Sequence, residues 1–122
     1  MRRNRVGVAF VAAAAIAVLA VGCGGSEEAP ADAKRLSFEL TDGGCAPRGA
    51  KAPAGPVVFE VENTGTSKVT EFEILDGEEI VGEKEDLTEG LSGSFDLDLE
   101  AGQYTIYCPG GATERGTLTV TG

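Results

Sequence analysis

The fold is decided by two neighbouring stretches, Gly102-Gln103-Tyr104-Thr105-Ile106-Tyr107-Cys108-Pro109-Gly110-Gly111 and Gly116-Thr117-Leu118-Thr119-Val120. Side chains alternate between the two faces of a strand, so the first stretch predicts a strand with Tyr104 and Ile106 on one face. It ends at Cys108 in a Pro-Gly-Gly turn, and the second stretch predicts a return strand with its leucine and valine inward. A cysteine at a strand end, beside a loop, can present its sulfur to a metal or to a second cysteine.

The rest of the chain after Lys34 shows the same alternation, in segments bounded by Gly, Pro or Asn at intervals of about ten residues. Asp76-Gly77 is a strong hairpin signal, and the Pro-rich segment 48–56 is predicted to be an edge or crossing strand. No stretch there keeps a helical period with a cap at each end. We therefore predict an all-β fold, a Greek-key β-sandwich, with strands at 36–40, 56–63, 69–75, 78–84, 92–99 and 102–107.

Residues 1–22 have the composition of an export signal. Three arginines among the first five residues precede an apolar run at 6–21 that is too short for a typical membrane-spanning helix. The run ends in Leu19-Ala20-Val21-Gly22-Cys23, which resembles the bacterial lipobox. This resemblance implies cleavage before Cys23 and a diacylglycerol anchor on that cysteine, which would tether the protein to the outer face of a membrane. The alternative is an ordinary signal peptide that is cut nearby and leaves Cys23 as a spare thiol.

Residues 23–34 follow as a small, acidic, Pro-bearing segment, which predicts a flexible linker. The chain of 122 residues then leaves one folded domain at 35–122, long enough for one modest core. We expect this domain to be a monomer.

The chain is strongly acidic, with 20 acidic residues, 10 basic residues, no histidine and a formal net charge of −10. Such a charge repels nucleic acid and anionic lipid surfaces and attracts cations, although it can also serve solubility alone. Without histidine there is no hydrolytic triad, and no glycine loop of the kind that cradles phosphates is present. We therefore expect neither a nucleic-acid partner nor enzymatic activity.

The late strand with its cysteine and the Gly-x-Leu-x-Val return resemble the cupredoxin superfamily. In that superfamily the late cysteine binds copper together with two histidines and a methionine. Cys108 stands in the place of that cysteine, but Gly111 occupies a histidine position and the single methionine begins the chain. A blue-copper centre needs two imidazoles beside the thiolate. The composition therefore excludes a blue-copper electron carrier.

A second set of motifs runs through the domain: Thr41-Asp42-x-x-Cys45-x-Pro47, Ala54-Gly55, Glu71-Phe72-Glu73-Ile74-Leu75-x-Gly77, Glu83, Glu85, Gly102-x-Tyr104-x-x-x-Cys108 and Gly116-x-Leu118-x-Val120. They are similar to the EfeO-type cupredoxin-like domain. That domain stands at the front of the periplasmic component of a bacterial ferrous-iron uptake system, and it also occurs in free-standing lipoproteins.

The resemblance implies a copper or iron site made of Cys45, Cys108 and Glu71, with Glu73 as a neighbour on the same face. Gln103 stands where the family usually has Glu, which removes one anionic oxygen. The resemblance also implies a cell-envelope location, on the outer face of the cytoplasmic membrane or in the periplasm. An iron permease system is the implied partner.

The residues leave several alternatives open. Cys45 and Cys108 can form a disulfide, act as thiolate ligands or switch between the two states. Glu71 and Glu73 can be metal ligands or the solvated face of a strand. The protein is accordingly either a membrane-anchored metal-binding module or a disulfide-stabilised interaction module without metal.

Overall fold

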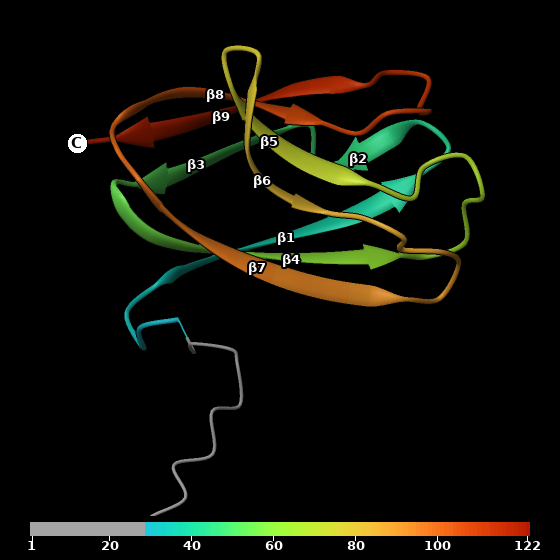
Figure 1. The fold of residues 1–122 in the computed structure, drawn as a ribbon, viewed down its shortest axis with the longest axis horizontal. Coiled ribbons are helices and arrows are strands. Elements are labelled where there is room, and N and C mark those ends of the chain that lie inside the picture. Colours follow the sequence, from blue (N-terminus) through green and yellow to red (C-terminus); the bar gives the residue numbers. More distant parts are fainter. Residues whose placement is uncertain (1–28) are drawn as a thin grey trace, which may run out of the picture.

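The computed structural model describes residues 29–122, which form a sandwich of two β-sheets (Figure 1). Sheet A has the strand order β2-β1-β4-β7, and sheet B has the order β3-β9-β8-β5-β6. The predicted Greek-key β-sandwich is confirmed. The strands of this part of the chain are β1 (Lys34–Thr41), β2 (Gly44–Ala46), β3 (Gly49–Pro53), β4 (Gly55–Asn63), β5 (Phe72–Asp76), β6 (Glu79–Lys84), β7 (Ser92–Leu99), β8 (Gly102–Tyr107) and β9 (Arg115–Thr121).

The N-terminal predictions fall almost wholly outside this part of the chain. The signal at 1–22, Cys23 and the linker up to residue 28 are not among the described residues. The first strand, β1, begins at Lys34, one residue before the predicted start of the domain. Within residues 29–122, no helix has the length and apolar character needed to cross a bilayer.

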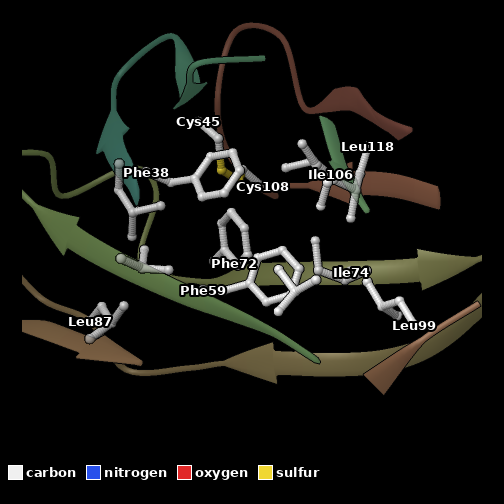
Figure 2. Packing of buried hydrophobic residues seen from close by; sticks show 14 of the residues in the cluster. Phe38, Cys45, Phe59, Phe72, Ile74, Leu87, Leu99, Ile106, Cys108 and Leu118 are labelled. Carbon is white, nitrogen blue, oxygen red and sulfur yellow. A yellow bond between two sulfur atoms is a disulfide. The ribbon is translucent and has the colours of Figure 1, made fainter. Parts of the chain in front are cut away.

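The core lies between the two sheets, where the inward residues of each strand meet. Phe38, Phe59 and Phe72 are almost fully buried, and the rings of Phe38 and Phe72 have centroids 4.8 Å apart (Figure 2). Phe95 stacks on Phe59 from β7 at 5.1 Å. Burial of each such side chain stabilises the fold by roughly 1.5–3 kcal/mol. The apolar residues that alternate along the predicted strands therefore face the core.

The β5–β6 hairpin fixes the register that matters for the site. Gly77 turns the chain with a φ of 63°, a conformation that residues with a side chain rarely adopt. The register shifts between Ile74 and Leu75, so that Phe72 pairs with Lys84 and Glu73 with Glu83. Phe72 and Ile74 are fully buried in the core. Glu73 consequently lies on the opposite face of sheet B.

Asn63 ties together the loops at one end of the sandwich. Its side chain is completely buried at the end of β4. The Nδ2 group donates to the carbonyl oxygens of Thr66, Val69 and Leu87, and Oδ1 accepts from the backbone N–H groups of Gly65 and Thr66. A buried amide satisfied in this way holds the chain after β4 and the chain after β6 in one arrangement.

Candidate functional site

Cys45 and Cys108 form a disulfide that joins the two sheets. Cys45 lies in β2 of sheet A and Cys108 follows β8 of sheet B, with their Cα atoms 5.9 Å apart (Figure 2). Cys108 is completely buried and Cys45 is 7% exposed. The predicted bridge is confirmed. In this form of the protein neither sulfur is a thiolate that could bind a metal.

The loop after Cys108 packs tightly against the turn between β1 and β2. The backbone N–H of Thr113 donates to the carbonyl of Gly43 at 2.9 Å, and Ala112 donates to the carbonyl of Asp42 at 3.1 Å. A Cβ atom added to Gly111 would lie 2.5 Å from the Cα of Gly44. Gly111 is the position where the cupredoxin resemblance places a histidine, so the backbone leaves no room for that ligand. The donor set and the space both fail to fit a blue-copper ion.

Glu73 lies on the outer face of sheet B, in a row of four side chains from four neighbouring strands. The members of this Glu73 row are Glu83, Glu73, Tyr107 and Arg115. Register pairs join Glu83 to Glu73, Glu73 to Tyr107, and Tyr107 to Arg115. The guanidinium carbon of Arg115 lies 4.7 Å from the centre of the Tyr107 ring, a cation–π contact. Tyr107 therefore separates the arginine from the carboxylates.

Glu73 is the unusual member of this row, because its side chain is nearly buried. The residue is only 8% exposed, whereas carboxylates on the outer face of a sheet are normally solvated. The two ion pairs within residues 29–122 join Arg35 to Glu60 and Lys68 to Asp42, and neither involves Glu73. Burial raises the pKa of Glu73, and the nearby charges of Glu71, Glu83 and Glu85 raise it further. The interpretation of this face as solvated is therefore wrong for Glu73.

The four predicted ligands form two separate pairs. Tyr107 lies opposite Glu73 on the outer face, so the next residue, Cys108, points to the core on the other side of the sheet. Within residues 29–122 no group of three or more cysteine, aspartate or glutamate side chains converges to hold a metal ion. The structure thus brings Cys45 to Cys108 and places Glu71 near Glu73, and sheet B lies between the two pairs.

A β-bulge decides which residue lies opposite Glu73. The Asp76-Gly77 turn alone would place Gly82 there, but the register shifts between Ile74 and Leu75 and places Glu83 opposite Glu73, which the local sequence does not signal. Gln103, by contrast, is exposed on β8, four residues before Tyr107. At about 3.3 Å per residue it lies roughly 13 Å along the strand from this row. The exchange of Glu for Gln there does not change the surroundings of Glu73.

We expect Glu73→Gln to stabilise the metal-free protein at pH 7 by up to about 1 kcal/mol, because it removes the like-charge pair with Glu83 across the strands. The folded state holds the Glu73 proton more tightly than the unfolded chain, so ionisation costs stability as the pH rises. Below about pH 3 the group is neutral in both states and the advantage should vanish. Denaturant unfolding at pH 3 and pH 7 measures the difference. Glu78→Gln in the exposed hairpin turn is the control, and an equal gain in both variants would contradict the explanation.

Residues 11–120 match the family model of the cupredoxin-like domain. The chain belongs to the cupredoxin-like domain family. In solved structures the same sandwich occurs in auracyanin B, with a TM-score of 0.65 and 18% identity over 80% of this chain and 94% of that chain. A reduced auracyanin from Roseiflexus castenholzii gives a TM-score of 0.60 and 13% identity, over 74% of this chain and 98% of that chain. These likenesses show the fold.

Curated relatives of this cupredoxin-like domain are iron uptake system components named EfeO. The protein from Yersinia pestis is 34% identical over 91 residues, and the one from Escherichia coli K12 is 32% identical over 92 residues. Each match covers 75% of this chain but only 24% of the relative, so the domain spans about a quarter of their length. The disulfide favours an extracytoplasmic location, because structural disulfides persist in oxidising compartments.

Proposed function

We propose that this cupredoxin-like domain is a non-catalytic module that binds metal ions, iron in particular, for uptake across the cell envelope. The observation that carries the proposal is the nearly buried Glu73 carboxylate, which has no cationic partner within residues 29–122, lies opposite Glu83 in the strand register and is repelled by the charges of Glu71, Glu83 and Glu85. Directly opposed like charges destabilise the folded protein, and a bound cation would relieve that repulsion.

The choice of ion follows from the available donors. With the two sulfurs bonded to each other, only oxygen ligands remain in this region, and oxygen ligands suit hard cations better than Cu(I). The carboxylates do not form a closed ligand set, so the bound ion would keep several waters and exchange readily. A weak, exchangeable site suits a protein that captures an ion and passes it on.

The relatives support the rest of the proposal. The domain matches part of proteins named as iron uptake system components, so an iron permease system is the partner we propose. A diacylglycerol anchor on Cys23 would hold the domain on the outer face of the cytoplasmic membrane, next to such a permease. The proposed protein is thus a lipid-anchored, extracytoplasmic iron-binding module.

Calorimetric titration of the purified full-length protein with Fe(II) under anaerobic conditions tests the proposal. We expect saturable binding of one ion, weakened at least tenfold by Glu73→Gln and by Glu83→Gln. Glu78→Gln removes the same charge from the exposed hairpin turn and should leave the affinity within twofold of the wild type. A parallel titration with Cu(I) should show weaker binding than Fe(II).

Unchanged Fe(II) affinity in both Glu73→Gln and Glu83→Gln would remove this site. If instead the wild-type protein binds no metal at all, the domain is the disulfide-stabilised interaction module that the sequence left open.

A further inference from the structure

The outer face of sheet A contains a hollow of about 620 Å³, on the opposite side of the sandwich from the Glu73 row. Its floor is formed by β1, β4 and β7, and Ala46 and Pro47 border it at the β2 side. The polar side chains that line it are Ser37, Glu39, Glu60, Glu62, Ser92 and Ser94.

Strand register arranges these side chains in two rows. Ser37, Glu60 and Ser94 are register partners across the three strands, and Glu39, Glu62 and Ser92 form the next row. Register partners share a face of the sheet, with Cβ atoms about 5 Å apart. Serine side chains are short, so the face is hollowed at β7 while the glutamates stand along its centre.

The charged side chains of this face are mostly carboxylates. Glu39 and Glu62 are exposed, directly opposed and without an ion-pair partner within residues 29–122. Asp96 and Asp98 add two exposed carboxylates, because they lie two and four residues after Ser94 and so share its face of β7. Opposed like charges destabilise a strand pair unless a counter-charge lies between them. Apart from Arg35, which pairs with Glu60, no cation among residues 29–122 forms an ion pair on this face.

The chain itself shows which group this face accepts. The Arg35 guanidinium binds the Glu60 carboxylate at 2.6 Å, and the Ser37 hydroxyl donates to the other Glu60 oxygen at 3.3 Å. Among the described residues, no such group pairs with Glu39 or Glu62, one row further along. A second guanidinium or ammonium group placed there would find two carboxylates and the Ser92 hydroxyl as acceptors.

We propose that the outer face of sheet A is a docking surface for a basic, extended segment of a partner protein. The Lys or Arg side chains of that segment lie between Glu39 and Glu62 and along the Ser92–Ser94 edge. Lipid headgroup phosphates and nucleic acid carry the same sign of charge as this face and are repelled. Within residues 29–122 the exposed large apolar side chains are Ile80 and Leu91, and neither lines the hollow, so a sugar has no apolar platform there.

Fluorescence anisotropy of a labelled octalysine peptide, titrated with the purified full-length protein at 50 and 150 mM salt, tests the proposal. We expect saturable binding that weakens with salt, because screening shortens the range of exposed charges. The double variant Glu39→Gln/Glu62→Gln should bind at least tenfold more weakly. The control Glu78→Gln/Glu79→Gln removes two charges from the hairpin of sheet B and should stay within twofold of the wild type.

Equal weakening in the two double variants would assign the binding to net charge and overturn the proposal. Saturable binding of a neutral oligosaccharide in place of octalysine would overturn it as well. Amide chemical shifts must change at Ser37, Ser92 and Ser94 when the peptide is added. Thermal unfolding of both double variants verifies that they fold. Glu73→Gln should leave peptide binding unchanged, so failure of the metal site and failure of this surface are distinguishable.

Discussion

Replacing both Cys45 and Cys108 with alanine will lower the free energy of unfolding by about 4 kcal/mol in the chain-entropy description of disulfides. The bridge closes a loop of 63 residues and joins sheet A to sheet B, so its loss greatly enlarges the unfolded ensemble. Alanine suits both positions because they are buried in the apolar core. For a domain of this size the midpoint of thermal unfolding should fall by roughly 20 °C.

Denaturant titration of the wild type and the double variant measures this difference. The wild type in excess reductant should approach the stability of the variant, because the loop is then open in both. Cys23→Ala removes the third cysteine and leaves the bridge intact, so its stability should equal that of the wild type. A loss below 1 kcal/mol in the double variant would show that the bridge contributes little to the fold.

Asn63→Ala is the second change with a large expected effect, a loss of roughly 3 kcal/mol or more. The substitution removes five hydrogen bonds and leaves the carbonyls of Thr66, Val69 and Leu87 without their donor. Each buried group left unsatisfied costs about 1–3 kcal/mol, although water can reach some of them after the side chain is removed. The loss should be concentrated at the loop end of the sandwich.

Chemical denaturation gives the total loss for Asn63→Ala, and amide hydrogen exchange locates it. Exchange should accelerate most at Gly65 and Thr66, whose N–H groups bond to Oδ1 in the wild type. Asn63→Asp keeps these two acceptor contacts but loses the donor and buries a charge, so it should also be strongly destabilised at pH 7. Thr64→Ala changes the exposed neighbour and is the matched control. Equal stability of Asn63→Ala and Thr64→Ala would refute the assignment.

Much of the fold follows from local rules. The alternation of Val57, Phe59 and Val61 with glutamates predicts one buried face, and the structure buries those three side chains. Segment 92–99 was predicted with the bounds of β7. The prolines near 53–56 predicted an edge, and β3 is an edge strand of sheet B. Period-two patterns are reliable where one face of a strand is buried and the other is wet.

Other features depend on contacts between distant residues, which local rules do not contain. The three-residue β2 is not among the predicted strands, because pairing with β1 rather than its own sequence makes it a strand. The assignment of strands to two sheets, with parallel pairing of β1 to β4 and β3 to β9, is likewise a tertiary result.

The candidate site shows the same division. The sequence allowed a disulfide, two thiolate ligands or a redox switch for Cys45 and Cys108. The structure has the disulfide, because the packing of the two sheets brings the two Cα atoms within 5.9 Å. The burial of Glu73 was missed because alternation places it on an outward face. That face is covered locally where Tyr107 and the neighbouring glutamates crowd the residue.

The position of β9 in sheet B has a consequence for biogenesis. This strand contains the last regular residues of the chain, yet it lies between β3 and β8 and pairs with both. While the polypeptide is being synthesised, β3 has no partner in its sheet until β9 has been made. Sheet B therefore cannot be completed before β9 is available, so the domain should reach its final fold only after this strand has been made.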